Sequence, residues 1–158
     1  MSTTAWRLVK AKHQDRPFAG EGARLFGGRW NNPGTPIVYA ASAISLALLE
    51  LLAYLEDASV LSSYVLFRAE IRENLIETLE AAILPRDWRA SPAHPSTKAI
   101  GDKWFHESRS AVLSVPSAVS PLERNYLVNP AHRDFRKIKT SGPLEYEFDP
   151  RIMELARH

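Results

Sequence analysis

The sequence predicts a single α+β domain, built on a mixed or antiparallel sheet with flanking helices. Two observations support this fold class. Predicted strands outnumber predicted helices, and most strands follow one another without a helix between them, which argues against a parallel, doubly wound sheet. The 158 residues also contain no internal repeat, low-complexity tract or long linker, so residues 1–158 are expected to form one domain.

The first part of the chain predicts two strands separated by a flexible turn. Residues 5–9 form the first expected strand, and residues 37–41 form the second because β-branched residues follow a proline there. Between them, residues 20–34 are expected to form a bent loop whose backbone can approach a ligand closely. This loop holds five of the seven glycines, namely Gly20, Gly22, Gly27, Gly28 and Gly34.

A helix is expected next, from residue 42 to about residue 57, because an apolar run continues there for several turns. Ser42, with Ser45 behind it, supplies the expected N-terminal cap. Residues 63–71 alternate well enough between apolar and polar to predict a long strand after this helix.

The second half of the chain predicts one more long helix and four more strands. The helix covers residues 96–110 and is opened by His94 and Pro95. Residues 111–115 and 125–128 are expected to be partner strands, since both are short apolar runs that end near a proline. The remaining expected elements are strands over residues 136–140 and 144–148 and a helical tail from Pro150.

The composition is that of an ordinary soluble globular protein, with 45% apolar and 24% charged residues. Lys and Arg number 20 against 18 Asp and Glu, so the net charge of +2 indicates no strong field for nucleic acid. The chain has no cysteine, which fits a reducing compartment and predicts a cytoplasmic location. No secretory signal or membrane span is expected, because charged residues precede or interrupt every apolar stretch.

Familiar motifs for nucleotides, metals and hydrolysis are missing from the sequence. A dinucleotide loop that begins at Gly20 and Gly22 would need a third glycine where Leu25 stands. No phosphate-binding loop ends in Gly-Lys-Ser/Thr, and the five histidines never stand at metal-ligand spacing, so no metal site is expected. His132 and Asp134 could join a serine in a hydrolase triad, but no Gly-x-Ser-x-Gly turn presents a nucleophile.

Glu50 is the single charged residue in the apolar run of residues 43–55. On a helix its nearest neighbours would be Leu46, Ala47, Ala53 and Tyr54. No solvated face then explains the charge, so the carboxylate is expected either to form an ion pair that holds the fold or to belong to a chemical site. Arg29 on the glycine-rich loop and Tyr39 on the following strand would supply the cation and the ring of such a site.

Four short segments carry the strongest functional signal. They are Phe26-Gly27-Gly28-Arg29-Trp30-Asn31, Val38-Tyr39-Ala40, Leu49-Glu50-Leu51 and Val115-Pro116-Ser117. Supporting segments are Trp6-Arg7-Leu8, Glu21-Gly22-Ala23-Arg24 and the run from Asn125 to His132. In this order they resemble the RES-domain family, which is named for an Arg, a Glu and a Ser and contains the toxins of RES–Xre toxin–antitoxin pairs. The resemblance covers nearly the whole chain.

The resemblance implies the fold of the diphtheria-toxin-type ADP-ribosyltransferases, in which helices flank a split sheet whose cleft holds NAD. It also implies which residues form the site. The expected catalytic residues are Glu50, Arg29 and Tyr39, and the residues expected to bind NAD are Arg29, Tyr39, Ser117, Gly28 and Arg7. The expected substrate is therefore NAD, with no metal.

These residue types also suit the cleavage of NAD on physical grounds. Breaking the nicotinamide–ribose bond builds positive charge on the ribose, which a fixed carboxylate such as Glu50 stabilises. Nicotinamide leaves as a neutral molecule, so the site needs no catalytic histidine. Arg29 can meet a diphosphate with its planar fork, and Tyr39 offers a flat face and a hydroxyl to the nicotinamide. Ser117 could hydrogen-bond the ribose or the carboxamide, although a turn serine usually bonds its own backbone.

The sequence therefore predicts the toxin of a type II toxin–antitoxin system that cleaves NAD. The ADP-ribosyl group would pass to water, to phosphate or to a protein side chain, and nothing in the sequence decides between these acceptors. The resemblance implies an Xre-type antitoxin as partner and a toxin homodimer within the complex. The net charge of +2 predicts no direct binding of the toxin to nucleic acid, and no contact with a membrane is expected.

Two other classes of function stay open from the sequence alone. One is a toxin that binds or cleaves RNA, and the other is a non-catalytic module that binds a partner. The basic residues that could serve RNA binding are Arg68, Arg72, Arg86, Arg89, Lys137 and Lys139. Several glutamates are interspersed among them, which favours an ordinary solvated surface.

Overall fold

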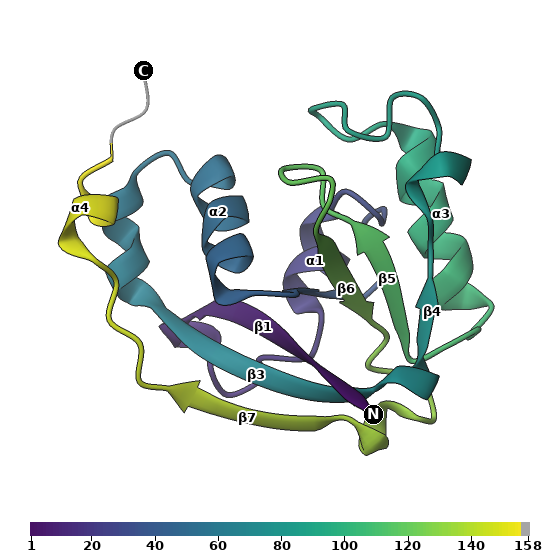
Figure 1. Cartoon of the computed structure of the whole chain (residues 1–158), viewed down its shortest axis with the longest axis horizontal. Helices are drawn as coiled ribbons and strands as arrows, with labels where there is room; N and C mark the ends of the chain where they lie inside the picture. The colour runs from purple at the N-terminus through teal and green to yellow at the C-terminus, as the bar shows by residue number, and fades with distance from the viewer. Residues whose placement is uncertain (156–158) are drawn as a thin grey trace.

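The computed structural model of the chain describes residues 1–155, which form a curled seven-stranded sheet with flanking helices (Figure 1). The strands are β1 (Ser2–Lys10), β2 (Val38–Ala41), β3 (Tyr64–Arg72), β4 (Ile76–Thr78), β5 (Val112–Pro116), β6 (Arg124–Val128) and β7 (Lys139–Leu144). Their order is β4-β5-β6-β2-β1-β3-β7, and only β4 and β5 pair in parallel within the described residues. The predicted α+β class with a mixed sheet is therefore confirmed. Residues 156–158 of the predicted domain, including His158, lie outside the described residues.

Four α-helices and several 3-10 turns surround this sheet in the described part of the chain. The helices are α1 (Glu21–Phe26), α2 (Ile44–Tyr54), α3 (Pro95–His106) and α4 (Pro150–Met153). The 3-10 turns are η1 (Ala11–His13), η2 (Ala58–Ser63), η3 (Glu73–Leu75), η4 (Ala81–Ile83) and η5 (Phe135–Lys137). Helix α2 packs against both β1 and β2, and α4 packs against η2 (Figure 1). No helix within residues 1–155 is long and apolar enough to cross a membrane.

The sheet is nearly divided between β1 and β2. These two strands pair at a single position, where Trp6 lies opposite Ala41. By contrast, β1 pairs with β3 continuously from Ser2 to Lys10, and β2 pairs with β6 along its whole length. We call this weak junction the seam. It joins an outer half-sheet of β1, β3 and β7 to an inner half-sheet of β2, β4, β5 and β6, and α2 lies across it.

The central strand β5 of the inner half-sheet is buried on both of its faces. Every residue of β5 is buried, and its side chains alternate between two apolar clusters. Val112 belongs to the cluster that reaches the outer half-sheet, whereas Leu113 and Val115 belong to a cluster that includes Trp30 and Trp104. Burial on both faces explains why this strand is a continuous apolar run in the sequence.

Helix α3 fixes the turn that carries Arg29. At Gly101 of this helix, a side chain would place its Cβ 1.8 Å from the carbonyl oxygen of Trp30. The helix backbone therefore lies directly against the turn, because glycine leaves room for the contact. The predicted helix over residues 96–110 is confirmed in position, although α3 ends at His106, and His94 caps it by accepting a hydrogen bond from the backbone N–H of Ser96.

The prediction that residues 20–34 form only a loop is wrong, because α1 lies inside this segment. Gly20 and Gly27 flank the helix with φ angles of 73° and 74°, a region that glycine adopts without strain. Between them, Arg24 pairs with Glu21 one turn earlier. Helix α1 buries no residue, so it has no apolar face from which the sequence could have predicted it.

The predicted cap of the next helix is also wrong. Ala43 stands at the N-cap of α2, and no side chain caps the helix. The helix ends at Tyr54, and Asp57 instead caps η2 by accepting a hydrogen bond from the backbone N–H of Ser59. The position of the helix, directly after β2 and above the seam, nevertheless agrees with the prediction.

The C-terminal strands differ most from the prediction. In place of strands over residues 136–140 and 144–148, the chain forms η5 and then the single strand β7. Strand β7 is largely exposed, and its position is set by pairing with β3 rather than by its own apolar pattern. Strand β4 was missed because it has three residues, too few to show a period. The strands predicted at 5–9, 37–41, 63–71, 111–115 and 125–128 and the tail helix are confirmed.

Candidate active site

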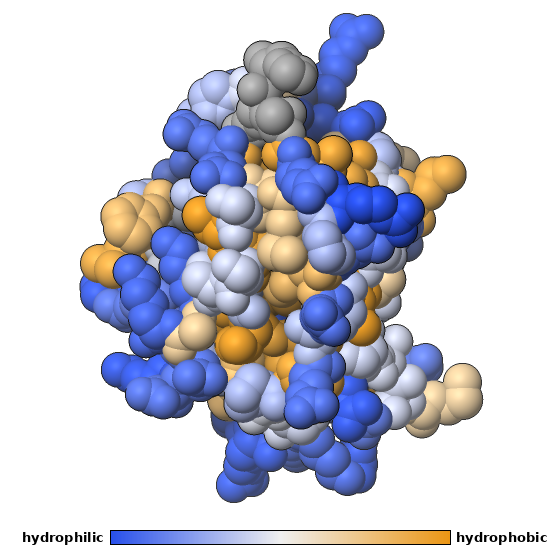
Figure 2. All heavy atoms as spheres, turned by 90° about the vertical axis from the view of Figure 1, so that its left-hand side faces the viewer, coloured by the Kyte–Doolittle hydropathy of each residue, from blue (hydrophilic) through white to orange (hydrophobic). Residues whose placement is uncertain are grey.

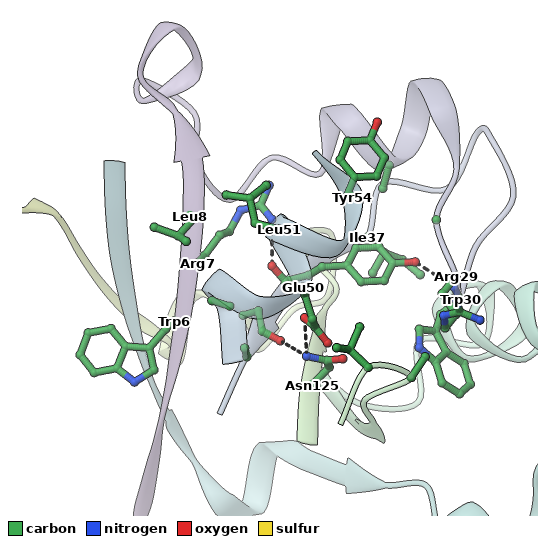
Figure 3. A pocket seen from close by; sticks show the side chains of 18 of the residues that line it. Trp6, Arg7, Leu8, Arg29, Trp30, Ile37, Glu50, Leu51, Tyr54 and Asn125 are labelled. Carbon is green, nitrogen blue, oxygen red and sulfur yellow. Dashed lines mark hydrogen bonds between the residues drawn. The ribbon is translucent and has the colours of Figure 1, made fainter. Parts of the chain in front are cut away.

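A cleft opens at the seam between the two half-sheets (Figure 3). Its volume is about 510 Å³, within the usual range for small-molecule sites. The walls come from β1, the turn after α1, β2, α2 and β6. Of the residues predicted to form a site, Arg7, Gly28, Arg29, Tyr39 and Glu50 all line this cleft, and Ser117 lies directly behind Glu50.

Neutral donors hold the carboxylate of Glu50. The hydroxyl of Ser117 donates to Oε1 at 2.8 Å, and the Nδ2 atom of Asn125 donates to Oε2 at 3.0 Å. Among the described residues, no Lys, Arg or His side chain lies within 4.0 Å of this carboxylate. The alternative that Glu50 forms a structural ion pair is therefore wrong.

Helix α2 is more exposed than the sequence suggested. Leu46 is its only fully buried residue, whereas Leu49 and Tyr54 are 46% and 81% exposed. The expectation that Glu50 lacks a solvated face is wrong for this reason. Glu50 is half-buried on the side of α2 that faces the cleft, so its charge can reach a bound ligand.

Burial raises the pKa of Glu50 above its usual range, because the ionised form loses hydration. The hydrogen bonds from Ser117 and Asn125 act in the opposite direction, as does the positive charge of Arg29, while Glu123 adds a small upward effect. Ser117 and Asn125 therefore offset part of the free energy that is needed to keep the Glu50 carboxylate ionised in the cleft.

Ser117 is completely buried, and its hydroxyl is fully used within the protein. Its oxygen accepts hydrogen bonds from the backbone N–H groups of Val119 and Ser120 while it donates to Glu50. The loop after β5 thus fixes the hydroxyl, and the hydroxyl fixes the carboxylate. Ser117 can influence a ligand in the cleft through Glu50.

The hydroxyl of Tyr39 is also used internally. It donates to Oδ1 of Asn31 at 2.5 Å and accepts from the backbone N–H of Trp30 at 3.0 Å. Burial raises the pKa of this hydroxyl, so it stays protonated. Gly28 permits the contact, because a Cβ there would lie 2.6 Å from the Tyr39 hydroxyl. The hydroxyl closes the turn, and the ring is left to face the cleft.

Two arginines bring positive charge to the cleft without a carboxylate partner among the described residues. Arg7 donates from Nε to the carbonyl oxygen of Pro17 and from Nη1 to that of Tyr39, at 2.7 and 2.8 Å. Burial without a nearby anion lowers the pKa of Arg7 to about 10. Arg29 donates from Nη1 to the carbonyl oxygens of Trp88 and Ala90, and burial lowers its pKa as well. Within residues 1–155, Nη2 of both arginines has no hydrogen-bond acceptor in the protein.

Sequence reasoning missed two asparagines that shape the site. Asn125 was noticed only as part of a family segment, and its contact with Glu50 joins positions 75 residues apart. Asn31 is fully buried and donates from Nδ2 to three carbonyl oxygens of the surrounding turn. An asparagine directly before an apolar run, as Asn125 is before Tyr126, Leu127 and Val128, is the signal that could have pointed to such a role.

The residues considered for a hydrolase triad lie away from this cleft. His132 bonds the carbonyl oxygen of Ser108, and its other ring nitrogen accepts from the backbone N–H of Asp134. Within the described part of the chain, no group of three or more His, Asp or Glu side chains could hold a metal ion.

Comparison with known proteins adds three relatives and a family. The family model described as the RES domain matches residues 4–149. A protein named Toxin Res from Photorhabdus laumondii is 41% identical over 150 residues, covering 94% of this chain and 96% of its own. A Prs ADP-ribosylating toxin from Sphingobium sp. is 35% identical over 161 residues, covering 99% of this chain and 100% of its own.

The third relative is MbcT of Mycobacterium tuberculosis, named an NAD(+) phosphorylase. It is 36% identical over 84 residues, which cover 52% of this chain and 44% of MbcT. The crystal structure of the MbcT–MbcA toxin–antitoxin complex contains a chain that superposes with a TM-score of 0.69 at 23% identity, over 90% of this chain and 82% of that one. The structural likeness shows a shared fold.

Proposed function

This chain belongs to the RES-domain family, and on that basis we propose that it is the toxin of a type II toxin–antitoxin system and cleaves the nicotinamide–ribose bond of NAD. The observation that carries the proposal is the Glu50 carboxylate, which neutral donors hold in a cleft. Two arginines that have no carboxylate partner among the described residues also line this cleft. The names of two relatives, an ADP-ribosylating toxin and an NAD(+) phosphorylase, support NAD as the substrate.

In the proposed reaction, the electron pair of the C–N bond leaves with nicotinamide, whose ring nitrogen becomes neutral. Positive charge develops on the ribose ring, and the Glu50 carboxylate stabilises it through the low-dielectric cleft. An oxygen nucleophile then bonds the anomeric carbon. Water or a hydroxyl group loses its proton to solvent in this step, whereas phosphate attacks through an anionic oxygen and has no proton to lose. Arg29 and Tyr39 are the other proposed catalytic residues, and they hold NAD by its diphosphate and by its nicotinamide ring, respectively.

Binding of NAD is proposed to depend on the two arginines that line the cleft. The free Nη2 atoms of Arg7 and Arg29 suit the diphosphate, since charge-assisted bonds to phosphate are strong. The ring of Tyr39 offers a face for nicotinamide, and the backbone at Gly28 allows close approach. Ser117 contributes through Glu50 rather than by contact with NAD.

The proposed partner is an Xre-type antitoxin that covers the cleft, with a toxin homodimer inside the complex. The solved relative comes from a toxin–antitoxin complex, which supports an antitoxin for this chain as well. Figure 2 shows the side of the molecule that carries α2 and α4, where apolar side chains gather between charged ones. Exposed apolar residues on α2 and η2 include Leu49, Tyr54 and Val60. Exposed apolar side chains of this kind suit a protein partner better than DNA.

Two further parts of the proposal concern fold and place. We propose that residues 1–158 form one RES domain of the diphtheria-toxin ADP-ribosyltransferase type, which the seam and its cleft support. The proposed place of action is the cytoplasm, where NAD is available as substrate.

The decisive experiment incubates purified protein with NAD and follows free nicotinamide together with the second product. Hydrolysis gives ADP-ribose, phosphorolysis gives ADP-ribose 1″-phosphate and requires added phosphate, and transfer gives a modified protein when lysate is supplied. We expect nicotinamide release under at least one condition, and loss of release when the antitoxin is bound. Absence of release under all three conditions, together with salt-sensitive RNA binding, would instead support the RNA-directed alternative.

A further inference from the structure

Asn125 stands opposite Ser117 across the carboxylate of Glu50. Each carboxylate oxygen has its own neutral donor. Ser117 donates to Oε1, and Asn125 donates to Oε2 (Figure 3). Asn125 comes from β6, where it pairs with Ala41 of β2, and its Nδ2 lies 3.5 Å from the carbonyl oxygen of Ala40. The amide thus ties the inner half-sheet to the carboxylate on α2, across the seam.

We propose that Asn125 is a positioning residue for the reaction, which aims the Glu50 carboxylate into the cleft and preserves its negative charge. This inference rests on the proposed function, because it assigns a role within NAD cleavage. The family resemblance includes Asn125 only as the first residue of a supporting segment and assigns it no role.

The first reason is geometric. Leu46 is the only fully buried residue of α2, so apolar packing around Glu50 is incomplete and does not fix its long side chain. A glutamate with free torsions samples several rotamers, and only some of them face the ribose. Two hydrogen bonds to opposite oxygens select one rotamer and define the plane of the carboxylate.

The second reason concerns charge. Arg29 and Glu123 are the charged groups that influence Glu50 electrostatically, and Arg7 lines the same cleft. None of the described cations is within 4.0 Å of the carboxylate. A lysine or arginine at position 125 would hold the carboxylate equally well, but its charge would cancel the field that stabilises a cationic ribose. A neutral amide positions the carboxylate without that loss, and it also favours ionisation against the effect of burial.

The test compares Asn125→Asp and Asn125→Leu with the wild-type protein. Both substitutions keep the approximate volume of the side chain and remove its donor, and the aspartate adds a competing negative charge. We expect kcat for nicotinamide release to fall by about tenfold or more, because a hydrogen bond to a charged group is lost, while KM for NAD changes less than about threefold. The acid limb of the pH profile should move to higher pH, most strongly in Asn125→Asp.

The matched control is Asn74→Asp, which makes the same change at an exposed position away from the cleft and should leave kcat, KM and the pH profile unchanged. Rates are expressed per folded protein, with the folded fraction taken from thermal unfolding. If either Asn125 variant does not fold, Asn125→Ser replaces it, because the shorter hydroxyl leaves Glu50 out of reach. Wild-type kcat and an unshifted acid limb in the Asn125 variants would overturn the inference, as would a change confined to KM.

A second readout separates this inference from the proposed function. The Glu50 side-chain carboxyl can be titrated directly by ¹³C NMR, with Glu50→Gln used to assign its signal. The midpoint should be higher in Asn125→Leu than in the wild-type protein, whether or not NAD is a substrate. If wild-type protein released no nicotinamide but the midpoint moved, the proposed function would fail and the contact would stand as structural. An unchanged midpoint with active wild-type protein would overturn the role of Asn125 alone.

Discussion

The Glu50 carboxylate and the two arginines of the cleft are all held by neutral partners, but they leave different atoms free. Ser117 and Asn125 occupy both oxygens of Glu50. Arg7 and Arg29, which lie on different sides of Glu50 (Figure 3), donate to backbone carbonyl oxygens through Nε or Nη1 and keep Nη2 without a protein acceptor in the described residues. The carboxylate is thus arranged to act through its field, and the arginines are arranged to touch a ligand. Changes around the carboxylate should lower kcat, and changes at the arginines should raise KM.

The largest effect is expected at the carboxylate, from Glu50→Gln. The amide keeps the volume of the side chain but removes the charge that faces the cationic transition state, so nicotinamide release should fall by about 100-fold to 1,000-fold. The variant should stay folded but lose about 1–3 kcal/mol of stability, because its NH2 group must face one of two donors, Ser117 or Asn125. Glu56→Gln, an exposed position just after α2, is the matched control and should keep full activity. Equal turnover by Glu50→Gln and the wild-type protein would remove Glu50 from the mechanism.

A smaller effect is expected at the two arginines. Arg7→Gln and Arg29→Gln should each raise KM for NAD by about 10-fold to 100-fold, since a charge-assisted hydrogen bond to a phosphate is worth about 1.5–3 kcal/mol. Their effect on kcat should be within about threefold. Calorimetry with NAD on a Glu50→Gln background measures the affinity without turnover, and Arg136→Gln at an exposed site is the control. A loss of kcat at constant KM would contradict the claim that the arginines act on binding and the carboxylate acts on the chemical step.

The smallest kinetic effect is expected from Tyr39→Phe. Its hydroxyl bonds Asn31 and the backbone of Trp30, so its loss should lower the free energy of unfolding by about 1–3 kcal/mol. The ring remains, and KM for NAD in the folded protein should change less than about twofold. Chemical denaturation measures the first quantity, with Tyr146→Phe at a more exposed site as control. A stable variant with a raised KM would show that the hydroxyl contacts NAD.

The same contrast between regions explains how much the sequence could predict. The strands that became β1, β2, β3, β5 and β6 are apolar runs buried in the core, and such burial leaves a readable pattern. Helix α1 and strand β7 bury little, and they depend on glycine conformations and on pairing with β3. Elements of that kind leave no pattern of their own.

The candidate site divides in a similar way. Glu50 was recognisable as a charge that an apolar run does not explain, and Gly28 and Arg29 were recognisable from their turn. Asn125 was not recognisable, because its role depends on Glu50, which lies 75 residues away in the sequence. The sequence also could not show that the hydroxyls of Tyr39 and Ser117 bond to other residues of the protein. The residue type shows only that a hydroxyl can form hydrogen bonds, and the partner depends on the fold.

The central claim is that the charge of Glu50 meets positive charge on the ribose, and binding of charged ring analogues tests it most directly. The measurement compares a cationic iminosugar analogue of the ribosyl group with its neutral isostere, on wild-type protein and on Glu50→Gln. We expect the wild-type protein to prefer the cationic analogue by about 100-fold, in the range of transition-state mimics, and Glu50→Gln to lose most of that preference. Equal affinity of the wild-type protein for both analogues, or an equal preference in both proteins, would contradict the account.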